Sequence, residues 1–197
     1  MHTREDNWKI MEKIEIKTNF VGYPMPVVLV GSVVAARPNF MTAAWITHVN
    51  YAPPLIAVAI GNSHHSRKGI AEHRQFSINI PGREMIEAVD YCGLVSGNNV
   101  DKSDLFETFT GRLEFAPMIA QCPLTLECTV VESVELQADT LFIGEITGAY
   151  ADEQCMTGGA PDVGKIQPFV LTMPDNNYWL LGDHAGRAWQ IGKNYCP

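Results

Sequence analysis

The chain has 197 residues and a formal net charge of −8, which argues against non-specific binding to nucleic acid or to an anionic membrane. Hydrophobic residues make up 46% of the chain and charged residues 18%, which argues against a disordered chain. We expect one domain over residues 1–197, in which residues 1–20 form a peripheral N-terminal segment.

The composition also predicts a cytoplasmic protein without membrane contact. The longest apolar run, residues 27–36, is too short to span a bilayer, and the mixed-charge N-terminus lacks the apolar core of a signal peptide. The cysteines are odd in number and form no C-x-x-C pair, which predicts reduced thiols, although a disulfide stays open as an alternative. They are Cys92, Cys122, Cys128, Cys155 and Cys196.

The first third of the chain predicts three strands. Apolar runs at residues 27–36 and 55–60 enclose a run at 40–49, which we interpret as the middle strand of the three. Turns that contain proline separate these runs from one another. Upstream, the alternation of isoleucine with polar residues over 10–16 predicts at most a peripheral strand.

After residue 60 the pattern becomes helical and then returns to strand. Ser66 is the predicted N-cap of a short helix over residues 67–74, and a strand over 75–80 follows it. Asp101 is the predicted cap of another short helix that ends near residue 106. Between the strand over 75–80 and Asp101, the pattern predicts a further helix that stops at Gly93. Its apolar face holds Met85, Ile86, Val89 and Cys92.

The last third of the chain again has a period of two. Residues 124–130 predict a strand whose exposed face holds Thr125, Glu127 and Thr129. The remaining elements are a strand over 140–150 with a bulge at Gly144, a loop over 156–165, a strand over 178–182 and a closing segment over 183–197. Strands with inserted helices predict a mainly β, mainly antiparallel barrel, and no G-x-G-x-x-G follows a strand, so a Rossmann site is not expected.

The stretch from Asn39 to Trp45 combines small residues with a large aromatic one inside a predicted strand. Small side chains at Thr42, Ala43 and Ala44 would let a flat ligand approach the backbone closely. Tight core packing is the alternative, and these residues alone favour it. A ligand wall therefore becomes the better interpretation when a second candidate site accompanies it.

A candidate phosphate site lies at the start of the first predicted helix. The hydroxyl of Ser66, the free N–H groups of the first turn and the cations Arg67 and Lys68 would together hold an anion. A solvated basic helix start is an equally good interpretation. His64 and His65 are adjacent and point to opposite sides of an extended chain, and no Cys or carboxylate lies nearby, so we expect no metal site.

A flexible turn over residues 96–102 is a third candidate, because it ends in a helix cap beside the cation Lys102, although such a stretch is more often a plain loop. Asn79 could present its amide at a strand end, with ordinary strand-end hydrogen bonding as the alternative. The chain has no G-x-S-x-G elbow, and Cys92 lies on an apolar helical face. We therefore expect no covalent nucleophile in the chain.

Short stretches form an ordered series along almost the whole chain from about residue 24. They are 26–30 (PVVLV), 39–45 (NFMTAAW), Pro53-Pro54, 66–70 (SRKGI), 76–81 (FSINIP), 89–91 (VDY), 96–97 (SG), 100–102 (VDK), 126–128 (LEC), 142–145 (FIGE) and 178–182 (YWLLG). The series resembles the flavin reductase-like FMN-binding split-barrel family, and within it the flavoredoxin group. No single motif is diagnostic, but their order is fairly specific.

The resemblance implies a Greek-key split barrel, usually a homodimer with FMN near the subunit interface. Ser66 would hold the phosphate with Arg67 and Lys68 nearby, and Ser63 and His65 of the same stretch belong to the implied cofactor site. Carried over by position, the residues that would line the ring and ribityl chain are Asn39, Met41, Thr42, Ala43, Ala44 and Trp45. Further contacts would come from Asn79, Gly97 and Lys102.

The resemblance also frames the expected function, which is an oxidoreductase that passes electrons from NADH, NADPH or a redox partner protein through bound FMN to an acceptor. An anion site and a close-packed wall suit FMN, which has a phosphate at one end and a flat ring at the other. Ala138-Asp139 stands where many relatives have Asp-His. A carboxylate would then replace an imidazole near the flavin and change the local charge, so we do not expect standard handling of the nicotinamide.

Two alternatives stay open: an FMN-bound electron carrier without nicotinamide turnover, and a non-catalytic barrel that binds another phosphate-bearing ligand. Whether residues 158–165 form a lid is also open.

Overall fold

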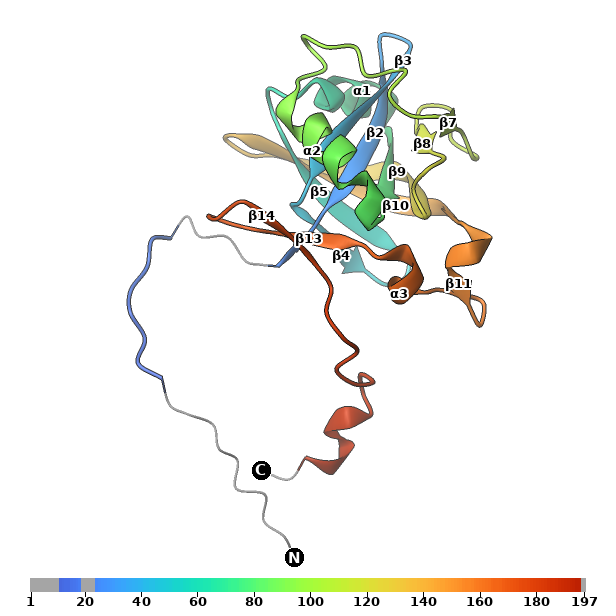
Figure 1. Cartoon of the computed structure of the whole chain (residues 1–197). Coiled ribbons are helices and arrows are strands. Elements are labelled where there is room, and N and C mark those ends of the chain that lie inside the picture. Colours follow the sequence, from blue (N-terminus) through green and yellow to red (C-terminus); the bar gives the residue numbers. More distant parts are fainter. Residues whose placement is uncertain (1–10, 19–23, 196–197) are drawn as a thin grey trace, which may run out of the picture.

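A seven-stranded antiparallel sheet forms the body of the molecule (Figure 1). The computed structural model describes residues 11–18 and 24–195. Every pair of neighbouring strands in this sheet runs antiparallel. In order across the sheet, the strands are β3 (Arg37–Ala43), β2 (Val28–Val34), β6 (Gln75–Ile80), β9 (Leu124–Glu135), β10 (Asp139–Ala151), β5 (Leu55–Gly61) and β4 (Ile46–Asn50).

The sheet curls into a barrel that stays open between its two edge strands. These edges are β3 and β4, although the two follow each other in the chain through residues 44–45. The interior is one apolar cluster to which all seven strands contribute, including Val30 of β2, Val58 of β5 and Phe142 of β10. This arrangement is an antiparallel split barrel, and the predicted fold class is confirmed.

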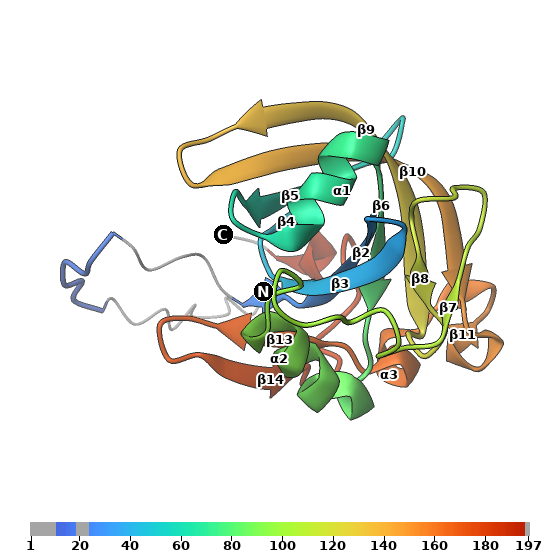
Figure 2. The same cartoon turned by 90° about the horizontal axis from the view of Figure 1, so that it is seen from above.

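Smaller elements surround the barrel and, apart from η3 in the C-terminal segment, lie against its flanks (Figure 2). The helices are α1 (His65–His73), α2 (Ile86–Leu94) and α3 (Val163–Ile166), with 3-10 turns η1 (Arg83–Met85), η2 (Glu153–Cys155) and η3 (Ile191–Asn194). One small sheet contains β1 (Met25–Pro26), β13 (Phe169–Thr172) and β14 (Asn177–Leu180). Two short hairpins pair β7 (Thr108–Phe109) with β8 (Met118–Ile119) and β11 (Met156–Thr157) with β12 (Ala160–Pro161).

Side chains of β3 alternate between two apolar cores. Met41 and Ala43 belong to the barrel interior, whereas Phe40 belongs to a second cluster that includes residues of α2. This follows from the period of two along a strand. Val89 and Cys92 of α2 are buried in the second cluster, so the predicted apolar face of this helix is confirmed.

The other long strands agree with the sequence. Strands are confirmed at 27–36, 55–60, 75–80, 124–130 and 140–150, and the fourth of these continues to Glu135. The bulge predicted at Gly144 is also confirmed, because the β9–β10 register shifts between Ile143 and Gly144. A Cβ at Gly144 would lie 2.6 Å from the ring of Phe76, so the barrel interior needs glycine there.

The predicted strand over residues 40–49 is wrong in its extent and its place. The chain leaves strand geometry at residues 44–45, and the two halves become opposite edges of the sheet, not one middle strand. β3 pairs with β2, and β4 pairs with β5. A barrel needs the chain to cross from one edge to the other, and a local apolar pattern cannot reveal that crossing.

Three predicted helix boundaries are wrong. α1 begins at His65 with His64 as its N-cap residue, so Ser66 lies inside the first turn. Gly93 does not stop α2, which ends at Leu94. Residues 101–106 form turns and not the predicted helix, and the Asp101 carboxylate accepts the N–H of Ser103 within a tight turn. A capping residue stabilises a turn or a helix equally well, so composition alone could not separate them.

The predicted exposed face of β9 is also wrong. Thr125 is buried, and so is Glu127, which accepts hydrogen bonds from the backbone N–H groups of Arg112 and Leu113. The hydroxyl of Tyr150 donates to the same carboxylate over 2.8 Å. The segment before β8 therefore covers this face of the sheet, and its backbone donors satisfy the buried charge.

The remaining segments differ from the sequence prediction in detail. Residues 156–165 are not one loop, because they hold the β11–β12 hairpin and the start of α3. Strand β13 was not predicted, while the strand at 178–182 appears as β14. Residues 11–16 form no strand, and Ile10 lies outside the described residues. Within the described ranges, no helix combines the length and the apolar character that crossing a bilayer requires.

Candidate functional site

Two adjoining hollows lie between β3, the start of α1 and the chain that follows α2. Their volumes are about 270 Å³ and about 190 Å³. Both are lined by His65, Gly97 and Lys102, so we treat them as one candidate site. The larger hollow is also lined by Arg37, Asn39 and Asn98, and the smaller one by Met41, Thr42 and Cys92.

Asn39 and Ser66 join β3 to the first turn of α1. The Asn39 amide nitrogen donates to Ser66 Oγ over 2.6 Å, and both side chains are buried. A hydroxyl that accepts one hydrogen bond still has its own proton to donate. The N–H groups of the first turn of a helix also lack intrahelical acceptors. Together these donors make the start of α1 suitable for an anion.

His65 and Lys68 converge on one acceptor, Oδ1 of Asn98. The distances are 2.9 Å from His65 Nδ1 and 3.0 Å from Lys68 Nζ. The amide nitrogen of Asn98 donates to the carbonyl of Ser63 over 3.3 Å, which holds this side chain against the turn before α1. A phosphate oxygen would be a stronger acceptor for a lysine than the neutral amide oxygen.

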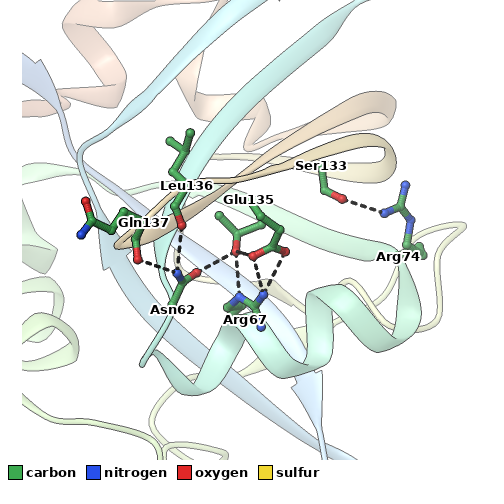
Figure 3. Close-up of polar contacts among 8 residues, drawn as sticks. Asn62, Arg67, Arg74, Ser133, Glu135, Leu136 and Gln137 are labelled. Carbon is green, nitrogen blue, oxygen red and sulfur yellow. Dashed lines mark hydrogen bonds and ion pairs between the residues drawn. The ribbon is translucent and has the colours of Figure 1, made fainter.

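Arg67 extends to the other side of α1, where it meets the β9–β10 hairpin (Figure 3). Its guanidinium lies 2.9 Å from both carboxylate oxygens of Glu135 and donates to Thr140 Oγ1 over 2.8 Å. Thr140 donates to Asn62 Oδ1 over 2.8 Å, just before α1. We call these four residues the hairpin clasp. Glu135 neutralises the charge that the sequence assigned to the phosphate site.

Lys102 is a buried cation that lines both hollows. The residue is 4% exposed, and its Nζ donates to the carbonyls of Val95 and Cys92 over 3.1 and 3.4 Å. These carbonyls lie at the C-terminal end of α2, where the helix dipole favours a positive charge. Burial lowers the pKa of Lys102. A bound anion would offset this loss of hydration.

Gly97 brings the turn after α2 against β3 and α1. A Cβ at this position would lie 2.4 Å from Oδ1 of Asn39 and 2.9 Å from Cδ2 of His65. The first distance is far shorter than van der Waals contact, so a larger residue would displace the side chains that line the site. The close approach explains why glycine is needed at this point of the turn.

The residues predicted to line the flavin ring are divided among the smaller hollow, the barrel interior and a separate apolar groove. Met41 and Thr42 line the smaller hollow, and Thr42 Oγ1 donates to the carbonyl of Val89. Ala43 faces the barrel interior, whereas Ala44 and Trp45 line an apolar groove of about 570 Å³. Trp45 is 48% exposed, so its side chain lies outside the core of the barrel.

Of the remaining predicted site residues, Asn79 lies apart from the hollows and Ser63 lies at their edge. Asn79 is fully buried, donates to the carbonyl of Leu29 over 3.0 Å and accepts the N–H of Ile119 over 2.8 Å. The structure therefore gives its amide a role in joining β6 to β2 and β8. Ser63 is exposed in the turn before α1, and its carbonyl accepts from Asn98.

Asn98 and Arg37 were missed as candidates. Asn98 lay inside the flexible turn that the sequence singled out, so the signal existed but did not distinguish it from its neighbours. Arg37 lines the larger hollow and pairs with Asp101, a contact across 64 positions of the chain that has no local signal. Asp139, the departure from the family pattern, begins β10 opposite Gly61.

Over residues 11–18 and 24–195, no group of three or more His, Cys, Asp or Glu residues is placed to hold a metal ion. In the same ranges Cys92, Cys122, Cys128 and Cys155 are free thiols. Burial raises the pKa of Cys92, so its thiol is held in the neutral form beside the site.

A split barrel with a pair of hollows between its edge strand β3 and the start of α1 defines the class of this protein. The flavin reductase like domain model matches residues 20–161, and the chain belongs to that family. Flavoredoxin from Methanosarcina acetivorans is 50% identical, with a TM-score of 0.91 over 93% of this chain and 98% of that one. Flavoredoxin of Desulfovibrio vulgaris (Miyazaki F) is 33% identical, with a TM-score of 0.86 over 93% and 100%. An NADH-dependent FAD reductase from Streptomyces globisporus is 26% identical over 70% of this chain and 76% of its own length.

Proposed function

We propose that this chain binds FMN and moves electrons through it, as a member of the flavoredoxin group. The observation that carries the proposal is that β3, the start of α1 and the turn after α2 meet around one pair of hollows, which His65 lines. Ser66 and Lys68 adjoin the larger hollow through their hydrogen bonds to Asn39 and Asn98, which line it. FMN needs a cationic, donor-rich end and an apolar flat end, and the site provides both. The similarity to two flavoredoxins supports the same assignment.

The phosphate end is assigned to the start of α1. Ser66 would donate its hydroxyl proton, and Lys68 would exchange Asn98 for a phosphate oxygen. Arg67 would support this site indirectly, because the hairpin clasp holds the helix start in place. The ring end is assigned to Met41 and Thr42 and to the backbone around residues 44–45, beside the apolar groove.

When bound, FMN supplies hydride and electron transfer, so the chain needs no nucleophile of its own. The chain contributes charge and exclusion of water. Lys102 is a fixed cation beside the smaller hollow, and it would stabilise negative charge that develops nearby on reduction. Apolar side chains in the groove beside Trp45 would keep water from one face of the site.

The electron donor divides two versions of this function. A nicotinamide-dependent reductase is supported by the family and by the similarity to an NADH-dependent FAD reductase. A carrier that exchanges electrons with a partner protein is supported by the higher similarity to flavoredoxins and by the carboxylate of Asp139. We also propose a homodimer with the flavin near the interface, because the apolar groove beside Trp45 lies open in one copy.

A spectroscopic experiment tests the proposal. The purified protein is titrated with FMN and examined for flavin absorbance and for quenching of protein fluorescence. Saturable binding is expected, and a protein that neither carries nor binds flavin would refute the function. Anaerobic mixing with NADH and then with NADPH separates the two versions. Rapid bleaching of the flavin identifies the reductase, whereas bleaching by dithionite alone identifies the carrier.

A further inference from the structure

The C-terminal segment after Gly182 leaves the barrel as an arm whose end carries large exposed apolar side chains. Figure 1 shows it running away from β14 and ending in the turn η3 (Ile191–Asn194). Trp189 is 92% exposed and Ile191 is 68% exposed. Such large side chains are costly to leave in water when they are held together on one element.

The end of this arm has a defined local structure. The N–H groups of Gln190 and Ile191 both donate to the carbonyl of Arg187, over 3.1 and 3.0 Å. Gly186 packs on Ile191, since a Cβ there would lie 2.4 Å from the Ile191 side chain. The backbone thus presents Trp189 and Ile191 on a formed turn before any partner is bound. A preformed turn loses less conformational entropy on docking.

A matching surface lies at the root of the arm. The groove beside Trp45 is lined by Pro24, Met25, Pro26 and Ile46, and a second groove of about 660 Å³ lies over Val170, Met173 and Trp179. Both grooves are lined by Pro24, so they form one apolar strip from the barrel opening to β14. We call this surface the apolar strip.

We propose that the arm of one copy docks on the apolar strip of a second copy. The arm runs away from its own strip, whereas a second copy presents the same strip to it and can return its own arm by two-fold symmetry (Figure 1). Charge favours the exchange, because the arm holds Arg187 and Lys193 against Asp183, while Asp175 lines the second groove of the strip. This exchange rests on the homodimer proposed above. It would cover the apolar groove that Ala44 and Trp45 line.

Photo-crosslinking identifies the contact and its direction. Trp189 is replaced by p-benzoylphenylalanine in the full chain, and equal amounts of unlabelled and ¹⁵N-labelled protein are mixed before irradiation. Adducts that join one label to the other, at peptides containing Met25, Trp45 or Met173, are expected. Adducts confined to one label, adducts elsewhere or the absence of adducts would overturn the exchange.

Variants test whether the contact stabilises the dimer. Trp189→Ser with Ile191→Ser should weaken self-association by on the order of tenfold or more in sedimentation equilibrium. Leu136→Ser, at an exposed apolar residue of the β9–β10 turn, is the matched control and should leave association unchanged. An unchanged constant for the double variant would refute the exchange. FMN titration of the same samples separates this result from the proposed function, because a protein that binds no flavin can still exchange its arms.

Discussion

Arg67 and Glu135 form an ion pair that fastens the start of α1 to the β9–β10 hairpin. One guanidinium nitrogen lies 2.9 Å from each carboxylate oxygen, across 68 positions of the chain. The pair explains how a cation can lie in the first turn of a helix, where the dipole disfavours it, in the absence of a ligand. It also assigns Arg67 a role in positioning the anion site rather than in contacting an anion.

The hairpin clasp predicts a coupled effect on stability. Arg67→Ala and Glu135→Ala should each lower the free energy of unfolding by about 1 kcal/mol, because the pair is partly exposed and Thr140 is buried beside it. The double variant should be little worse than either single one, as measured by urea unfolding. FMN affinity should change less than in Lys68→Ala. A large loss of affinity confined to Arg67→Ala would show that Arg67 contacts the phosphate.

The phosphate assignment predicts a selective loss of affinity. Ser66→Ala combined with Lys68→Ala should weaken FMN binding by roughly 2–4 kcal/mol, the cost of charge-assisted hydrogen bonds. Riboflavin, which lacks the phosphate, is the control ligand, and its affinity should change far less. Fluorescence titration measures both. Equal losses for the two ligands would place the phosphate elsewhere.

Gly97 predicts a steric effect confined to the site. In Gly97→Ala the new methyl group would displace Asn39 and His65, and we expect FMN binding to weaken by about 1–3 kcal/mol. Gly182→Ala is the matched control, because a Cβ at Gly182 meets no atom within 4 Å. Isothermal titration compares the two variants. Wild-type affinity in Gly97→Ala would mean that the turn can move away without cost.

Buried thiols predict a loss of stability at alkaline pH. Burial raises the pKa of Cys128, and that of Cys122, to about 12, from 9.0 for an exposed thiol. Their contribution is therefore fully present below pH 9, where both states are protonated, and it is lost as the pH rises from 9 to 12. The slope should reach ~1.4 kcal/mol per pH unit for each thiol.

Urea unfolding at several pH values measures this alkaline slope. Cys128→Ala should be less stable at pH 7, because it leaves a small cavity, but its stability should fall less steeply above pH 9. Cys155, which is partly exposed, provides the matched control variant Cys155→Ala. An identical slope in Cys128→Ala and the wild type would contradict the assignment.

Much of the strand pattern could be read from local sequence, because each of these strands buries a continuous apolar run or an alternating face. The edge crossing at residues 44–45 could not, since strand pairing depends on barrel closure. Glu127 marks a second limit of the same kind. Its charge predicts exposure, and its burial is made tolerable by the backbone of Arg112 and Leu113 and the hydroxyl of Tyr150, none of which is a neighbour in the chain.

The sequence by itself determined the barrel class, the small residues of β3 and the basic, hydroxyl-containing start of α1, because these depend on local pattern and composition. The tertiary structure decided how the site residues are distributed. It turned Arg67 toward Glu135, committed Asn79 to neighbouring backbone and brought Asn98 to His65 and Lys68. The physical reason is that each of these side chains bonds a partner that lies at least 30 positions away in the chain.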